Sequence, residues 1–141
     1  MREILRRLSA SRFVRFAVVG GAGFFVNEAA LAVAHELFGV GPRAGWFIAF
    51  VPAVTFTWWG NRKLTFADKA SSHHIGILAE WARFAATNSL GAAANFAVYA
   101  LLIGAAPWPF NIPYLALAIG ILVGLVFNFT LSKKLVFRDG A

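Results

Sequence analysis

The feature that most limits the fold is a set of four long apolar segments. They run from about Phe16 to Phe38, from Trp46 to Trp59, from Phe84 to Ala106 and from Ile112 to Leu131. A helix needs about 20 residues to cross the hydrocarbon of a bilayer, with a range of about 17–25. The second segment reaches that length only if it extends to Arg43 or Asn61. We therefore predict an all-α integral membrane protein of one domain with four transmembrane helices.

The composition excludes an ordinary soluble enzyme. Charged residues make up 13% of the 141 positions, whereas a soluble domain carries about a quarter. The sequence has no Cys, and its three His do not resemble a zinc site. It also has no nucleophile–base set and no phosphate-binding glycine loop. We expect no enzymatic activity, no metal and no cofactor.

Glycine and proline mark the turns between the segments. Gly39, Gly41 and Pro42 follow the first segment, and Pro107, Pro109 and Pro113 separate the third from the fourth. Pro52 lies inside the second segment, where it is expected to kink the helix or loosen one turn.

Lys and Arg are distributed asymmetrically. Five precede the first segment, four lie between the second and third, and three follow the fourth, while only Arg43 lies on the opposite side. Such an excess marks the cytoplasmic face, so both termini are predicted to be cytoplasmic in a multi-pass protein of the cell membrane. With its net charge of +7, the protein is expected to bind anionic lipids, not nucleic acid.

The basic N-terminal segment, residues 1–14, has an amphipathic pattern. One helical face would carry Met1, Ile4, Leu5 and Leu8, and the other Arg2, Arg6 and Arg7. A short interfacial helix on anionic lipid and a frayed basic tail both explain this pattern. A cleaved signal peptide does not, because the apolar run begins only after Arg15 and is too long.

The two halves of the chain resemble each other. At an offset of 68 residues, Arg15-Phe16 matches Arg83-Phe84, Gly23 matches Gly91 and Asn27 matches Asn95. At an offset of 71, Arg62-Lys63-Leu64-Thr65-Phe66 matches Lys133-Lys134-Leu135-Val136-Phe137. Each half then forms a two-helix hairpin, and both hairpins enter the membrane from the same side. We predict two tandem parallel repeats, at 15–66 and 83–137, joined by a cytoplasmic loop at 67–82.

Three motifs occur in order along the chain. They are Arg15-Phe16-x-x-Val19-Gly20, Asn61-Arg62-Lys63-Leu64-Thr65-Phe66 and Asn128-Phe129-x-x-Ser132-Lys133-Lys134-Leu135-Val136-Phe137. From about Ser11 to Arg138 the chain resembles the GtrA-like family of small four-helix membrane proteins. The resemblance implies translocation of polyprenyl-phosphate-linked sugars across the cytoplasmic membrane, for cell-surface polysaccharide or glycan modification. Leu64 and Leu135 stand where an aromatic residue, usually Trp, is expected, and Lys133 where Arg is common.

A carrier of such a lipid needs cations for phosphate at the membrane edge, where Arg offers a bidentate fork and Lys a point charge. The candidates are Arg15, Arg62, Lys63, Arg83, Lys133 and Lys134. They form a ring if the four cytoplasmic helix ends converge. Each of them can instead be a topology determinant or a snorkelling anchor.

The sugar needs hydrogen-bonding groups inside the bilayer. Candidates for this path are Asn27, Glu28, Asn88, Asn95 and Asn128. Asn27 and Asn95 lie twelve residues beyond Arg15 and Arg83, about 18 Å along a helix and so near the midplane. Packing hydrogen bonds between helices explain these amides equally well. Glu28 could carry a coupling proton, form an ion pair with an Arg that points inward, or be uncharged.

Close helix packing is predicted at several glycines, namely Gly20, Gly21, Gly23, Gly91, Gly120 and Gly124. Four helices enclose little volume, so we expect a homo-oligomer.

Two other functions remain open. A proton-coupled cation exporter, resembling small multidrug resistance transporters, would use Glu28, although the basic rim would repel its substrate. Alternatively, the protein transports nothing and serves as the membrane anchor or partner of a glycosyltransferase.

Overall fold

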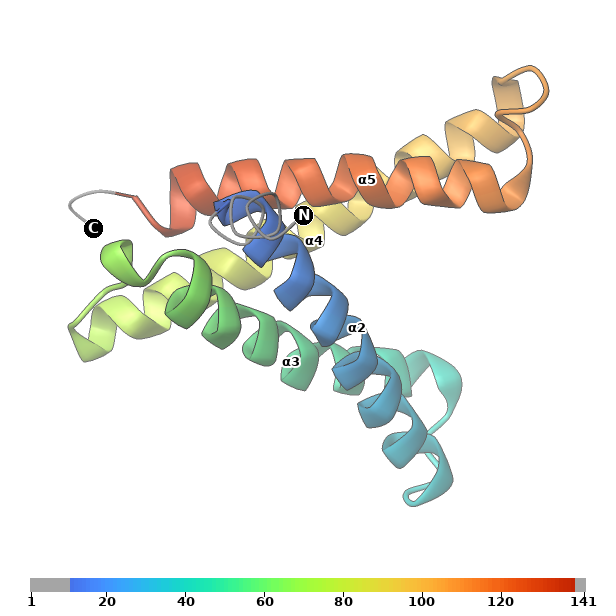
Figure 1. Cartoon of the computed structure of the whole chain (residues 1–141). Coiled ribbons are helices and arrows are strands. Elements are labelled where there is room, and N and C mark those ends of the chain that lie inside the picture. Colours follow the sequence, from blue (N-terminus) through green and yellow to red (C-terminus); the bar gives the residue numbers. More distant parts are fainter. Residues whose placement is uncertain (1–10, 139–141) are drawn as a thin grey trace, which may run out of the picture. The chain divides into compact units, whose positions relative to one another are not determined.

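A computed structural model describes residues 11–138, and within this range every regular element is helical. The helices are α2 (Arg12–Glu36), α3 (Pro42–Gly60), α4 (His74–Ala105) and α5 (Pro113–Leu131), shown along the chain in Figure 1. Three short turns are η1 (Asn61–Thr65), η2 (Ala67–Lys69) and η3 (Ser132–Val136). The all-α prediction is confirmed. Most of the N-terminal segment predicted to lie on lipid falls outside the described residues.

Three of the described helices are long and apolar enough to cross a membrane. They are α2 with 25 residues, α4 with 32, and α5 together with η3 with 24. Protein covers little of their most apolar stretches, so these faces are available to lipid. The 19-residue helix α3 is not among them. Pro52 does not interrupt α3, which remains our predicted fourth span.

The chain divides into two compact units, with the boundary inside α4 between Trp81 and Ala82. In the first unit, α3 packs against α2. Gly23 and Gly60 make this approach possible, because a side chain at Gly23 would overlap Thr57 and one at Gly60 would overlap Val19. The predicted packing role is confirmed for Gly23. At Gly20 and Gly21 an added β-carbon would have no described neighbour within 4 Å, so a packing role there stays a prediction.

The second unit is held together by α4 and α5. Gly91 of α4 lies against the amide of Asn128, and Gly120 and Gly124 of α5 lie against Asn95. A side chain at any of these glycines would overlap or press on the facing Asn. Small residues here let the two backbones approach, as the sequence predicted.

The turns follow the predicted chemistry. Gly39 adopts φ +61° between α2 and α3, a conformation that side chains disfavour. Pro113 is the first residue of α5, where its missing N–H is not needed. By contrast, α4 begins at His74, well before Phe84, so much of the predicted loop 67–82 is helical. Apolar runs locate the part of a helix that lies in hydrocarbon, not the turns beyond it.

The ends of α3 and α5 share a feature that the apolar segments did not predict. Each helix continues into a π-helical turn, where the Phe66 N–H bonds to the Asn61 carbonyl at 2.8 Å and the Phe137 N–H bonds to the Ser132 carbonyl at 2.9 Å. These turns carry Phe66 back onto the start of α2, and Phe137 back onto Phe84, which lies beyond the first turns of α4. Phe66 meets Phe16 edge to face with centroids 6.4 Å apart, and Phe137 meets Phe84 at 6.2 Å.

We predict that Phe66→Ala and Phe137→Ala each destabilise the protein. Both rings are completely enclosed, and truncating a packed Phe removes about 3–5 kcal/mol. Thermal unfolding of the purified protein in detergent measures the loss. Phe25→Ala is the control, because that ring is 73% exposed and faces outward. Equal stability of all three variants would show that the ring pairs do not hold the helix ends.

Candidate functional site

Arg62 is engaged by protein groups at the end of the first hairpin. Its Nη1 donates to Glu80 Oε1 at 2.7 Å, and its Nη2 donates to the Ser71 carbonyl. The guanidinium also lies 5.8 Å from the centre of the Trp58 ring. Only 15% of the side chain is exposed. Arg62 was predicted as a phosphate ligand, and in this structure its charge is already balanced.

Glu80 is the partner that sequence reasoning missed. Its side chain is 3% exposed, and its carboxylate accepts hydrogen bonds from Arg62, from Trp58 Nε1 at 3.0 Å and from the Ser71 N–H at 2.8 Å. Residues 69–138 contain no other Asp or Glu, a signal that could have singled it out. Its three donors come from the end of α3, the following loop and η1. This cluster therefore ties the start of α4 to the end of α3.

A second ion pair lies at the surface of the same unit. Arg12 Nη2 and Asp68 Oδ2 are 2.6 Å apart. Partial desolvation raises the pKa of Asp68, but the hydrogen bond from Arg12 and its positive charge outweigh this and leave the pKa below its usual value. The pair therefore stabilises the fold above the unfolded pKa and loses this contribution as the pH falls. Because Arg12 is 34% and Asp68 56% exposed, water screens the pair and the contribution is small.

The other predicted phosphate ligands lie at the ends of the hairpins. Lys63, Arg83, Lys133 and Lys134 are exposed, and Arg15 is half-buried with its Nε enclosed and without an acceptor among the described residues. The Phe16–Phe66 contact brings the start of α2, with Arg15, to the turn that carries Arg62 and Lys63. The Phe84–Phe137 contact likewise brings Arg83 to the end that carries Lys133 and Lys134. Each unit thus gathers three of the six predicted cations at one end.

The predicted path residues lie in different surroundings. Asn95 and Asn128 face glycines across the α4–α5 contact, and Asn128 Oδ1 is enclosed without a donor in the described chain. Asn88 donates to the Phe84 carbonyl at 3.0 Å, so its amide is used within α4. Asn27 is half-buried on α2.

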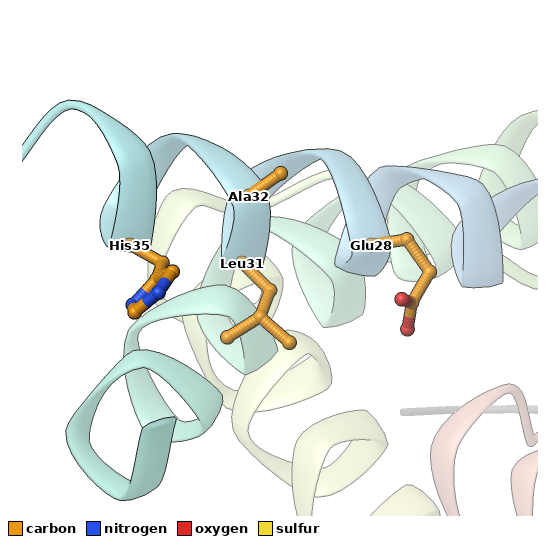
Figure 2. Close-up of a pocket in the computed structure, with 4 residues that line it drawn as sticks. All are labelled: Glu28, Leu31, Ala32 and His35. Carbon is orange, nitrogen blue, oxygen red and sulfur yellow. The ribbon is translucent and has the colours of Figure 1, made fainter. Parts of the chain in front are cut away.

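Glu28 lies on an exposed face of α2. Together with Leu31, Ala32 and His35 it lines an open pocket of about 280 Å³. Figure 2 shows Glu28, Leu31 and His35 projecting to the same side of the helix. His35 Nδ1 is also 3.1 Å from the Val40 carbonyl, which fixes the ring at the helix end. Glu28 thus stays a predicted path residue.

One comparison with known proteins bears on this arrangement. A family model described as GtrA/DPMS, transmembrane domain, matches residues 15–137. The chain belongs to this family. The match begins beside Phe16 and ends at Phe137, so it contains both Phe pairs and both π-helical turns. A search of curated proteins gave no match.

Membership confirms the resemblance found in the sequence. This GtrA/DPMS domain is a membrane protein, consistent with its three apolar helices. The family also indicates involvement in the handling of polyprenyl-phosphate-linked sugars.

We predict that Glu80→Ala destabilises the protein strongly, because it leaves Arg62 with an uncompensated charge. Removing one partner of a buried ion pair typically costs about 3–5 kcal/mol. Thermal unfolding and hydrogen exchange of the loop 66–73 measure the effect. Asp68→Ala is the matched control, since it removes the exposed partner of Arg12. If both changes were equally mild, the buried cluster would not hold the loop.

Proposed function

We propose that the chain translocates polyprenyl-phosphate-linked sugars across the cytoplasmic membrane, alone or as the membrane subunit of a larger assembly. Family membership carries this proposal. The apolar helices and the cations gathered at the hairpin ends support it, because a lipid phosphate needs positive charge at the membrane edge. In this proposal the protein is a carrier, not an enzyme, and uses no cofactor.

The proposed architecture is four spans in two tandem hairpins, at 15–66 and 83–137, with both termini cytoplasmic. Matched geometry supports it. Helices α3 and α5 each begin at a Pro, run for 19 residues and end in a five-residue π-helical turn, all at an offset of 71. The facing pairs Gly23–Thr57 and Gly91–Asn128 also correspond. General apolarity does not produce paired π-helical turns, so a duplicated hairpin is the simplest origin.

The proposed mechanism separates the two polar parts of the substrate. Cations hold the phosphate near the headgroups, where they remain solvated. The sugar crosses along side-chain amides, since a hydroxyl in hydrocarbon loses its hydrogen bonds to water unless protein groups replace them. One chain encloses little polar surface, and we propose that a homo-oligomer completes the path.

We predict the topology from the charge distribution. Single cysteines at Ser72 and Ala106 should react with a membrane-impermeant thiol reagent from opposite sides, with Ser72 on the cytoplasmic side. The chain has no natural Cys, so each label reports one position. Labelling of both sites from the same side would contradict the four-span proposal.

We predict that vesicles containing the purified protein expose inner-leaflet polyprenyl-phosphate sugar to an external quenching or oxidising reagent. Protein-free vesicles and vesicles containing heat-unfolded protein should protect about half of the lipid. Equal protection in all three preparations would reject translocation. Co-purification with a glycosyltransferase would then favour the anchor, and proton-driven cation uptake would favour the exporter.

A further inference from the structure

The two hairpins differ in polar side chains at four corresponding positions. At the offset of 71, Thr57 corresponds to Asn128, Asn61 to Ser132, Arg62 to Lys133 and Thr65 to Val136. All of them lie in the last turns of α3 and η1, or of α5 and η3. The backbones there have the same form, so the side chains decide what each end can bind.

At the end of the first hairpin these groups are satisfied by neighbouring protein groups. Asn61 donates to the Thr57 carbonyl at 2.9 Å and accepts from Thr65 Oγ1 at 2.8 Å. The Thr57 hydroxyl bonds to backbone carbonyls three and four residues earlier in α3. Arg62 is paired with Glu80. These four side chains therefore offer little hydrogen-bonding capacity to a ligand, whereas Arg15 Nε, at the same end, is enclosed and unpaired among the described residues.

In the second hairpin the corresponding groups are not satisfied. Ser132 is completely buried, and its Oγ bonds no protein group in the described chain. Val136 stands where Thr65 would supply a hydroxyl, which accounts for this difference. The Asn128 amide lies against Gly91, with Oδ1 enclosed and unpaired among the described residues. Buried polar atoms are normally paired, so two unpaired ones a single turn apart point to a ligand that pairs with them.

The two hairpins also differ in whether a carboxylate pairs with their cations. Residues 82–138 contain Arg83, Lys133, Lys134 and Arg138 but no Asp or Glu. The second hairpin therefore has no internal carboxylate for these cations, and Arg83, Lys133 and Lys134 are exposed. These exposed cations are therefore available to an anionic ligand. Lys133 follows Ser132 directly, so unbalanced charge and unpaired hydrogen-bonding groups occur at one end of one helix.

We propose that the second hairpin holds the substrate and the first is a structural counterpart. Lys133 and Lys134 bind the phosphate, and Asn128 and Ser132 pair with sugar hydroxyls. The two polar residues are about 6 Å apart along the helix, within reach of one sugar ring. The ligand is thus a membrane lipid with a phosphate ester next to a hydroxyl-rich group. This assignment rests on the proposed function.

The test measures binding of three lipids to the full chain in nanodiscs, namely polyprenyl phosphate with a sugar, polyprenyl phosphate alone and phosphatidylglycerol. Lys134→Gln and Lys63→Gln form a matched pair, because both lysines are exposed and correspond at the offset of 71. We expect Lys134→Gln to weaken binding of both polyprenyl lipids at least fivefold and Lys63→Gln to change it less than twofold. Equal effects of the two substitutions would overturn the assignment of the phosphate.

Ser132→Ala separates a binding role from a structural one. It removes a hydroxyl without a protein partner in the described chain, so thermal stability should stay the same or rise. Binding of the sugar-bearing lipid should weaken at least threefold, and binding of polyprenyl phosphate alone should not change. Asn128→Leu should also weaken binding of the sugar-bearing lipid. Thr57→Val, at the corresponding position of the first hairpin, is its control and should leave that binding unchanged. Unchanged sugar-lipid binding in both Ser132→Ala and Asn128→Leu would overturn the assignment of the hydroxyls.

The wild-type protein distinguishes failure of this inference from failure of the proposed function. If the wild type binds the sugar-bearing lipid and the second-hairpin variants bind it equally well, only the inference fails. If the wild type binds neither polyprenyl lipid, the proposed function fails and the inference with it. If Lys134→Gln weakens phosphatidylglycerol binding as much as polyprenyl binding, the lysines are general lipid anchors and the inference is overturned.

Discussion

A peptide group in hydrocarbon has no water to bond, so every N–H and C=O must find its partner inside the chain. Helices meet this requirement along their length, and at their ends the chain needs other partners. Here α3 and α5 end in π-helical turns that pair one further N–H each. Polar side chains obey the same constraint, since Thr55, Ser89 and Thr130 each donate to the carbonyl four residues earlier. Burying such a side chain in a membrane costs little free energy, but its hydroxyl proton is no longer available to a substrate.

The same constraint makes unpaired polar groups informative. In the first unit, Asn61, Arg62 and Glu80 satisfy one another or nearby groups, and the cluster fixes the loop between α3 and α4. In the second hairpin, Asn128 and Ser132 keep oxygens that are unpaired within the described chain, beside uncompensated lysines. In the proposed repeat, Asn61 and Arg62 are thus closed by protein contacts, whereas the corresponding end of α5 keeps two unpaired oxygens in the described chain.

Much of the fold could be predicted from the sequence. Apolar runs located the helices, because a span must be apolar over a length set by the bilayer. Gly39 marked a turn, because it takes a positive φ. The motifs around Arg15, Asn61 and Asn128 indicated the family that the comparison then confirmed. The start of α4 was missed, because a helix can continue into water without an apolar signal.

For the candidate site, residue types and spacing determined which side chains could bind phosphate or sugar. Which of those side chains are already paired was decided only by the tertiary structure. Arg62 and Lys133 look equivalent in sequence, yet Arg62 meets Glu80, eighteen residues further along the chain. Asn61 and Ser132 also correspond. Asn61 accepts a hydrogen bond from the Thr65 hydroxyl one turn later, whereas the Ser132 hydroxyl has no partner in the described chain. The physical reason is that a hydrogen bond or ion pair requires atoms within about 3 Å, and that distance depends on how the chain folds back on itself.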